Sequence, residues 1–374
     1  MKLLNILVLI LIFISCDKTP STINSIVDDT NIEVKSSELS LSSIVKIKKI
    51  IPLETNSASL LGNIEKIMKR NNKYYIKSKN RSLAIFDLTG KYVNSIGSLG
   101  VGPEEYPALL DFDTDSEFIY ILTTNKIQVY SQQGNFIKFI PLSLNVSGFR
   151  VVNDKILLFV LGDSYVVHLI DFEGKTIDKR LKRTQPLRLT KSIPFVRYGS
   201  DYFLFPQGHA NNILAFNIIK ERFENLKYLS SLNNMSAEEE ANMNEPKLAN
   251  NKGYSQNKRS FDGLTSSITQ TIFGSIERDE VVLWVKDISQ NQVNAYLFAS
   301  LNDDLTFTSS DFLVKENTDG GDVFLSYLMP YSITEGLGKN QMFSDNKNYK
   351  TLQLMLDSIS VEESNPVIIE YVFK

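Results

Sequence analysis

Pairs of short alternating apolar stretches, each pair joined by a polar turn, recur along the middle of the chain. The clearest copy is SLAIFDLTGKYVNSIG at residues 82–97, in which Gly90 lies in the turn. Later copies also have a turn glycine: residues 126–142 with Gly134, and residues 166–181 with Gly174. Alternation of apolar and polar residues is typical of strands that are buried on one face. The pattern therefore predicts a repeated β-hairpin.

The spacing of these hairpins predicts the architecture. The three turn glycines and Lys220, which stands in the turn of a fourth copy, lie 44, 40 and 46 residues apart. A period of about 40–45 residues is typical of four-stranded propeller blades. Residues 44–53 form a further apolar strand before the first blade, and residues 366–374 are its natural partner. We therefore expect an all-β, six-bladed propeller of four-stranded antiparallel blades over residues 44–374, with the last blade closed by the N-terminal strand.

The period breaks at residues 230–262, which are polar, Asn-rich and acidic and are expected to form an insertion. The fifth blade is expected to resume with a first strand at residues 266–274 and to end with a strand at residues 305–310. The sixth blade is the least regular. There we expect a glycine-rich turn through Gly336 and Gly338, a short strand near Met342 and Phe343, and a helix at residues 349–358.

The N-terminus has the pattern of an export signal. A charged start is followed by the apolar run Leu3–Ile14 and then by Ser15 and Cys16. The run is shorter than the ~20 residues that span a bilayer, so residues 1–15 are predicted to be a signal peptide. A small residue before a cysteine resembles a bacterial lipobox, and Cys16 is the single cysteine of the chain. Cys16 is therefore predicted to carry lipid, the alternative being a chance cysteine after an ordinary signal peptide.

Residues 16–43 are rich in Ser, Thr, Asp and Asn and have no sustained hydrophobic period. They are predicted to form a flexible tether between the membrane and the propeller. The alternative for the second half of this segment is a short ordered extension that lies on the domain.

Composition excludes some functions. The chain of 374 residues is 43% hydrophobic and 22% charged, which suits a folded protein with a large core. Its formal net charge is −3, and no basic cluster is present that could neutralise phosphates. Nucleic-acid binding is therefore not expected.

Acidic residues on a predicted inner strand suggest a central site. Asp111 and Asp113 alternate on one strand face, and the inner strands of other blades contribute further polar residues. The candidate channel-lining residues are Glu65, Asp111, Asp113, Arg150, Arg197 and Gln270. They could hold a cation or a polar ligand, or they could satisfy one another together with ordered water. The second interpretation is favoured.

The loop GSLGVGPEEY at residues 97–106 resembles a phosphate-binding loop in its glycines but lacks the Lys and the Ser or Thr that must follow them. We interpret it as a connection between blades. Because such connections gather on one face of a propeller, Glu104, Glu105 and Tyr106 are candidate binding residues at the rim.

Catalytic motifs are not apparent. The two histidines, His168 and His209, lie 41 positions apart, and neither has the spacing of a metal ligand or a catalytic triad member. A non-enzymatic role is therefore favoured.

Three segments resemble a known family. IPLETNSASLLGNIEKI at residues 51–67, FDLTGKYVNSIGSLGVGPEEY at residues 86–106 and NPVIIEYVFK at residues 365–374 resemble the six-bladed β-propeller lipoproteins of Bacteroidota, distant relatives of NHL-type propellers. The chain departs from the usual loop of that family at Glu104, where a second glycine is common. The resemblance implies a lipoprotein in the envelope of a Gram-negative bacterium.

Two functions follow as hypotheses. The first is an exported module, lipid-anchored to the outer membrane through Cys16 and facing the periplasm or the surface, that binds a glycan, a peptide or another envelope protein. The alternative is a hydrolase or lyase that depends on a divalent cation, with Ca²⁺ held in the channel by Glu65, Asp111 and Asp113. No other cofactor is expected.

Overall fold

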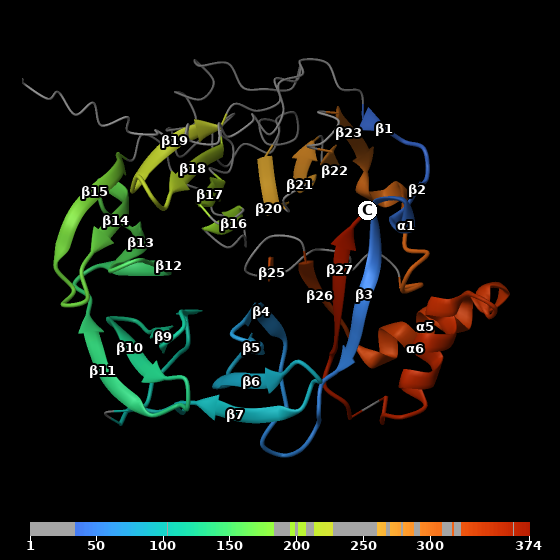
Figure 1. Cartoon of the computed structure of the whole chain (residues 1–374), viewed down its shortest axis with the longest axis horizontal. Helices are drawn as coiled ribbons and strands as arrows, with labels where there is room; N and C mark the ends of the chain where they lie inside the picture. Colours follow the sequence, from blue (N-terminus) through green and yellow to red (C-terminus); the bar gives the residue numbers. More distant parts are fainter. Residues whose placement is uncertain are drawn as a thin grey trace, which may run out of the picture.

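The computed structural model describes residues 34–102, 104–182, 195–198, 201–206, 213–226, 260–266, 270–277, 280–287, 292–308, 316–317, 323–361 and 363–374. Over these residues the chain is mainly β, and its sheets are arranged in a ring (Figure 1). The expected signal peptide, Cys16, the first half of the tether and residues 230–259 of the expected insertion lie outside the described residues, as does His209.

The first four sheets follow one another along the chain, each with four antiparallel strands in sequence order. The first contains β4 (Ile64–Arg70), β5 (Lys73–Ser78), β6 (Leu83–Asp87) and β7 (Tyr92–Ile96). The second contains β8 (Asp111–Thr114), β9 (Phe118–Leu122), β10 (Lys126–Ser131) and β11 (Phe136–Pro141). The third contains β12 (Asn145–Val152), β13 (Lys155–Leu161), β14 (Tyr165–Ile170) and β15 (Thr176–Lys182). The fourth contains β16 (Val196–Tyr198), β17 (Tyr202–Pro206), β18 (Ile213–Asn217) and β19 (Arg222–Leu226). These sheets confirm the predicted antiparallel propeller architecture.

The remaining sheets combine the two ends of the chain. A five-stranded sheet contains β20 (Ser260–Ser266), β21 (Gln270–Glu277), β22 (Glu280–Asp287), β23 (Gln292–Leu297) and β1 (Val34–Lys35), which is parallel to β23. A four-stranded sheet contains β25 (Glu316–Asn317), β26 (Val323–Leu328), β27 (Val367–Phe373) and β3 (Val45–Pro52). β2 (Leu39–Ser40) pairs with β24 (Leu301–Asn302). The described residues thus form five four-stranded sheets, where six four-stranded blades were expected, and one five-stranded sheet.

The N-terminal and C-terminal strands lie side by side. β3 pairs antiparallel with β27, and Ile51 lies opposite Ile368. Just before β3, residues 34–43 contain β1, β2 and the start of the short helix α1 (Leu41–Ile44), with Leu39 and Leu41 buried. This part of the expected tether is therefore ordered, because its leucines pack into the core. The alternative of an ordered extension fits these residues.

The repeated turns pack against the neighbouring sheet. Gly90 and Gly174 have φ values of +87° and +86°, which favour glycine. A side chain at Gly90 would also overlap the carbonyl of Pro52, and one at Gly174 would overlap the carbonyl of Pro141. The fourth turn has no glycine, and there Glu221 takes the positive φ, at 50°. The repeat seen in the sequence therefore marks a contact between successive sheets.

The hydrophobic core is divided into clusters that lie between neighbouring sheets. One cluster joins Ile67 of β4 and Phe86 of β6 to Leu325 of β26 and Ile368 of β27. Equivalent clusters lie between the first and second, the second and third, and the third and fourth sheets. This division is expected of a propeller, in which each blade buries its faces against its neighbours.

The last part of the chain differs from the expected elements. Residues 330–361 contain α5 (Pro330–Lys339), the 3-10 turn η2 (Gln341–Phe343) and α6 (Lys347–Leu356). Gly336 and Gly338 thus lie inside a helix rather than in a turn, and Met342 and Phe343 lie in η2 rather than in a strand. The expected helix at 349–358 is present as α6. The helices project from the edge of the ring (Figure 1).

The fifth sheet also begins earlier than expected. Its first strand is β20, at residues 260–266, so residues 260–262 belong to the sheet and not to the insertion. A β-bulge beside Gly263, between Asp262 and Leu264, interrupts the alternation there, which hides the strand from the sequence pattern. The strand expected at residues 305–310 is not formed at residues 305–308, where the chain turns. The 3-10 turn η1 (Phe298–Ser300) precedes this segment. No helix in the described ranges combines the length and the apolar character needed to cross a membrane.

Candidate functional site

The predicted channel carboxylates lie on the inner strand β8, and Asp111 is held by four donors. Its Oδ1 accepts hydrogen bonds from Lys66 Nζ at 2.7 Å and from the Phe112 amide at 2.8 Å. Its Oδ2 accepts from the Phe149 amide at 3.1 Å and from Arg150 Nη1 at 3.3 Å. Burial alone would raise the pKa of Asp111, but the charges of Lys66 and Arg150 outweigh it and the pKa lies below its usual value. Asp111 is therefore an ionised, fully engaged carboxylate.

Asp113 is engaged in a similar way. Its Oδ1 accepts from the Thr114 amide at 2.9 Å and from Arg70 Nη1 at 3.2 Å. Its Oδ2 accepts from the Val151 amide at 2.8 Å. Side chains at positions 111 and 113 thus bind the backbone of the next inner strand, β12.

Basic side chains make the corresponding link on the other side of β8. Lys66 Nζ donates to the Phe112 carbonyl at 2.6 Å, and Arg70 Nη1 donates to the Thr114 carbonyl. On the neighbouring sheet, Glu370 of β27 accepts from Lys69 Nζ at 2.5 Å and from the Tyr74 hydroxyl at 2.6 Å. Charged side chains therefore connect successive sheets near the centre of the ring.

These basic partners and Glu370 are absent from the site residues predicted from sequence. The available signal was the series Lys66, Lys69 and Arg70 on one predicted inner strand, which places cations beside the carboxylates of the next strand. Among the predicted residues, the structure brings together Asp111, Asp113 and Arg150. Asp111 pairs with Arg150, whereas Asp113 pairs with Arg70, which was not among the predicted residues.

The other predicted channel residues lie elsewhere. Glu65 is the extra residue of a β-bulge in β4; its side chain is 42% exposed and pairs with Lys77 at 2.8 Å. Arg197 on β16 is half-buried over the Phe203 ring, 5.6 Å from its centroid. Gln270 begins β21, the second strand of its sheet, because β20 takes the inner place beside β16 and β25. Glu65 is therefore engaged by Lys77 rather than by the residues around Asp111, and Gln270 lies on a second strand rather than on an innermost one.

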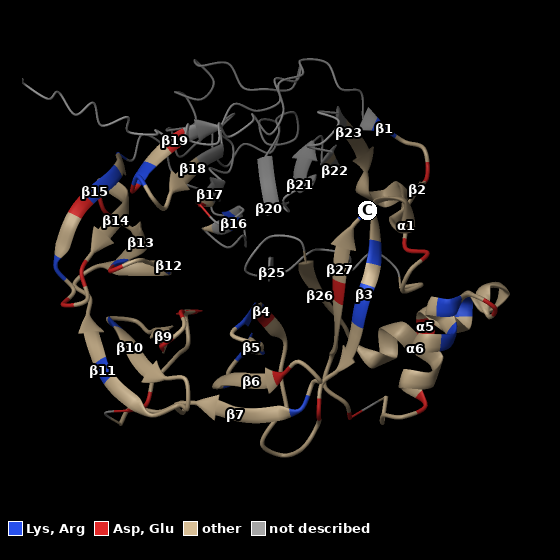
Figure 2. Ribbon diagram, viewed as in Figure 1, with Lys and Arg blue, Asp and Glu red and all other residues tan. Residues whose placement is uncertain are grey.

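The arrangement offers little to a metal ion. In the described part of the chain, no group of three His, Cys, Asp or Glu side chains is placed to hold one. The oxygens of Asp111 and Asp113 face cations and amides, which take the places that a Ca²⁺ ion would occupy. Basic and acidic residues are interspersed along the strands that Figure 2 colours by charge.

The three predicted rim residues have different environments. Tyr106 is fully buried, and its hydroxyl donates to the Ile96 carbonyl at 2.7 Å. The carboxylate of Glu105 folds back on its own loop and accepts from the Gly102 amide at 2.8 Å. Only the side chain of Glu104 is exposed. Tyr106 and Glu105 stabilise the loop, and Glu104 is the member of the set that solvent can reach freely.

The histidine that the structure describes is also buried. His168 on β14 is fully buried, and its Nε2 lies 3.7 Å from Asp163 Oδ1. Burial lowers the pKa of His168, so the ring is neutral at neutral pH. This environment is that of a core residue.

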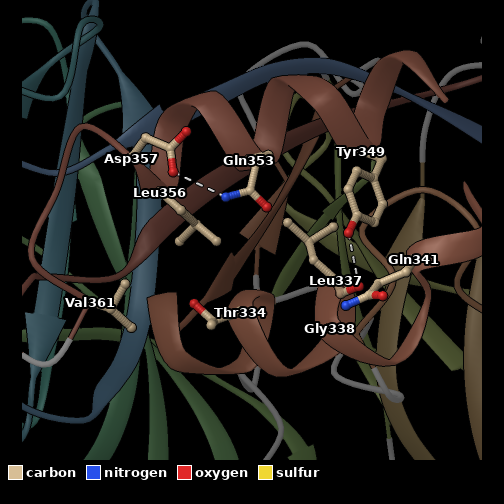
Figure 3. A pocket seen from close by; sticks show the side chains of 9 residues that line it. All are labelled: Thr334, Leu337, Gly338, Gln341, Tyr349, Gln353, Leu356, Asp357 and Val361. Carbon is tan, nitrogen blue, oxygen red and sulfur yellow. Dashed lines mark hydrogen bonds between the residues drawn. The ribbon is translucent and has the colours of Figure 1, made fainter. Parts of the chain in front are cut away.

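A cavity of about 310 Å³ lies between α5 and α6 (Figure 3). The nine residues that line it are Thr334, Leu337, Gly338, Gln341, Tyr349, Gln353, Leu356, Asp357 and Val361. Thr334 of α5 and Gln353 of α6 point into the space between the helices (Figure 3). Gln353 Nε2 donates to Asp357 Oδ1 at 3.0 Å. The Tyr349 hydroxyl donates to the Leu337 carbonyl at 3.0 Å, which fixes the ring at the wall.

The two glycines of α5 differ in their surroundings. A methyl group at Gly336 would overlap the carbonyl of Phe307, so this glycine allows the helix to pack closely on the segment before it. A methyl group at Gly338 would have no neighbouring atom within 4 Å. Glycine inside a helix costs about 1 kcal/mol relative to alanine. Close packing therefore requires glycine at position 336, whereas no neighbouring atom requires it at position 338, which lies in the wall of the cavity.

Comparisons with known proteins agree with the fold. A protein of Bacteroides fragilis described as exported is similar over 92% of this chain and 100% of its own, with 18% sequence identity and a TM-score of 0.74. BamB from Moraxella catarrhalis (13% identity, 67% of this chain and 66% of that chain, TM-score 0.37) matches only weakly. So does a protein of unknown function from Bacteroides caccae (10% identity, 60% and 78%, TM-score 0.38). A search of the curated proteins found no match.

The family described as Domain of unknown function (DUF4934) matches residues 24–371. That range begins in the segment before β1 and ends inside β27, so it includes every sheet described above. Because the match spans nearly the whole chain, the protein belongs to this DUF4934 family.

Proposed function

We propose that this protein is an exported lipoprotein, anchored to the outer membrane through Cys16, whose propeller is a ligand-binding module. The apolar run Leu3–Ile14 before Ser15 and Cys16 supports the export and the anchor. The similar Bacteroides fragilis protein is described as exported, which agrees with this address.

The propeller in this proposal has six blades. The five four-stranded sheets supply five of them, and β20–β23 supply the other, with β1 added at its edge. The pairing of β3 with β27 supports closure of the last blade by the N-terminal strand. A closed ring leaves no gap between the first and the last blade, so it is a rigid support for a binding site.

The observation that carries the binding function is the cavity between α5 and α6, with Gly338 in its wall. Polar groups near the centre of the ring already bind one another, whereas Thr334, Gln341 and Gln353 border open space. A concave site with an apolar floor and a few polar groups is the usual form of a small-ligand site. Glu104 at the rim is a candidate for a second contact.

Thermal unfolding in the presence of a small-molecule extract tests this function. The extract is prepared from the bacterium in which the protein naturally occurs. A ligand that binds the folded state raises the Tm. The extract should raise the Tm of the wild type and of Gly338→Ala, but not that of Gly338→Trp, in which a bulky indole is added to the lining of the cavity. An equal rise in all three proteins, or none in the wild type, would overturn the binding proposal.

The address is tested separately. Replacing Cys16 by Ala should move the protein from the membrane fraction to the soluble fraction, because a lipid anchor needs the thiol. If Cys16→Ala stays with the membranes, the lipoprotein part of the proposal fails while the cavity result stands.

No contact in the described residues favours the metal-dependent hydrolase or lyase. Calorimetric titration with CaCl₂ decides the point. We expect no stoichiometric binding heat, because cations and amides already occupy the oxygens of Asp111 and Asp113. Stoichiometric binding that is lost in Asp111→Asn would revive the enzyme hypothesis.

A further inference from the structure

The walls of the cavity carry little charge. None of its nine lining residues is Lys, Arg or His, and Asp357 is the one charged residue among them. A phosphate or carboxylate ligand would find no counter-charge in the lining and would face the carboxylate of Asp357. The lining therefore disfavours anionic ligands.

A cationic ligand is also poorly matched. Ammonium groups are commonly held by several aromatic faces, and Tyr349 is the one aromatic residue in the lining. Its ring packs edge-on against Phe307, with 5.6 Å between centroids, and its hydroxyl is tied to the Leu337 carbonyl. Asp357 is exposed and already accepts from Gln353. The cavity thus lacks both an aromatic box and a buried carboxylate.

The polar groups that remain suit hydroxyl groups. Gln353 and Asp357 lie one helical turn apart and present an amide and a carboxylate side by side (Figure 3). An amide has two hydrogens and a carbonyl, so after donating once to Asp357 it can still donate and accept. The Thr334 hydroxyl donates to the Pro330 carbonyl at 3.1 Å, which leaves its oxygen as an acceptor toward the cavity. Adjacent hydroxyls of a ligand, each both donor and acceptor, complement such a set.

The floor of the cavity is apolar. Leu337 and Leu356 are buried, and Val361 is half-buried beside them. These side chains can pack against the C–H groups of a ligand whose hydroxyls point toward the polar wall. The volume of about 310 Å³ lies at the small end of ligand cavities, which run from ~300 to ~1,000 Å³.

We infer that the cavity between α5 and α6 binds an uncharged polyhydroxylated compound of about monosaccharide size. This inference rests on the proposed binding function and adds the class of ligand. Gln353 and Asp357 form its polar wall, Leu337 and Leu356 form its floor, and Gly338 lies in the wall without a side chain.

Saturation-transfer NMR on the full chain tests the ligand class. The neutral probes are D-glucose, D-galactose and N-acetyl-D-glucosamine, and the charged probes are D-glucose 6-phosphate and choline. We expect saturation transfer to at least one neutral sugar and none to the charged probes. Gly338→Trp should abolish the signal, and Gln353→Ala should weaken the affinity about tenfold through the loss of one hydrogen-bonding group.

Matched variants distinguish a loss of sugar binding from a loss of the folded structure. Leu354→Ala changes the neighbouring residue on the outer face of α6, which is 71% exposed, and should leave sugar binding unchanged. Gln353→Ala alters an exposed side chain, so its fold is expected to survive even if Gly338→Trp unfolds.

The outcomes distinguish the proposed binding function from the inferred class of ligand. A neutral-sugar signal that responds to Gly338→Trp and Gln353→Ala supports the inference. A signal confined to a charged probe, and blocked by Gly338→Trp, overturns the ligand class but keeps the binding function. The absence of saturation transfer to every probe overturns the ligand class. Thermal unfolding in the presence of the small-molecule extract then tests the binding function independently. A sugar signal that neither variant reduces overturns the assignment to this cavity.

Discussion

Asp111 on β8 and Asp357 at the end of α6 are both hydrogen-bonded carboxylates, and they differ in their surroundings. Asp111 is buried between Lys66 and Arg150 and connects its own sheet to the sheets on both sides. Asp357 is exposed, bonded to Gln353, and borders an open cavity. Buried charges that are matched by fixed partners stabilise a unique arrangement, whereas polar groups beside open space are available to a ligand. Charge on an inner strand is therefore a poor guide to function here.

Removal of each carboxylate gives the largest expected contrast. Asp111→Ala leaves Lys66 and Arg150 buried without their shared partner, and we expect a loss of about 3–5 kcal/mol in the free energy of unfolding. Asp357→Ala should change it by less than about 0.5 kcal/mol, because the side chain is exposed. Urea unfolding of both variants measures the difference. Similar losses would mean that the two regions do not differ as described.

The two helix glycines give an intermediate contrast. Gly336→Ala forces a methyl group onto the Phe307 carbonyl and should destabilise the protein by about 1–3 kcal/mol. Gly338→Ala meets no atom within 4 Å and should stabilise it by about 0.4–1 kcal/mol through the helix backbone. Thermal unfolding of the two variants, compared at equal protein concentration, checks both signs. Destabilisation by Gly338→Ala would show that the structure requires glycine at this position.

The pH dependence gives the smallest contrast in stability, between Asp111 and the partly buried Asp303, which directly follows β24. The pKa of Asp111 is lowered, so its stabilisation is present above the unfolded-state pKa and is lost as pH falls through the folded-state pKa. Burial raises the pKa of Asp303, which accepts hydrogen bonds from Thr306 and Thr308. Its contribution has the opposite sign: it is present at low pH and is lost as pH rises through the raised pKa.

Unfolding free energies between about pH 7 and pH 3 test these signs. The stability gap between wild type and Asp111→Asn should narrow as pH falls below about 4, near the usual carboxyl range. The gap between wild type and Asp303→Asn should instead widen on acidification from neutral pH. Parallel curves for all three proteins would contradict both assignments.

The strands of the first four sheets could be predicted from sequence because one face of each hairpin is buried, and burial produces alternation. Prediction failed where a β-bulge or a contact with a distant segment determined the local structure. β20 carries a bulge and polar residues, so alternation is lost, and it was assigned to the insertion. The glycines at 336 and 338 suggested a turn, although close packing on Phe307 explains the first and an open cavity accompanies the second. Local composition does not report such contacts.

The candidate site was predicted only in part, for a similar reason. Alternation placed Asp111 and Asp113 on one face of an inner strand, and the structure agrees. It could not reveal that Lys66 and Arg70 reach them from another sheet, because those residues are 45 and 43 positions away in the chain. The cavity between α5 and α6 had no sequence signature, since its lining combines ordinary helix residues.

The sequence by itself determined the repeat, the antiparallel sheets built on it and the strand at each end of the domain. Burial of one face of a strand produces an alternation of apolar and polar residues that can be recognised in the local sequence. Tertiary structure alone decided which charges are satisfied and which polar groups border open space. Those properties depend on distances between segments far apart in the chain, and only the packing of the sheets and helices sets those distances.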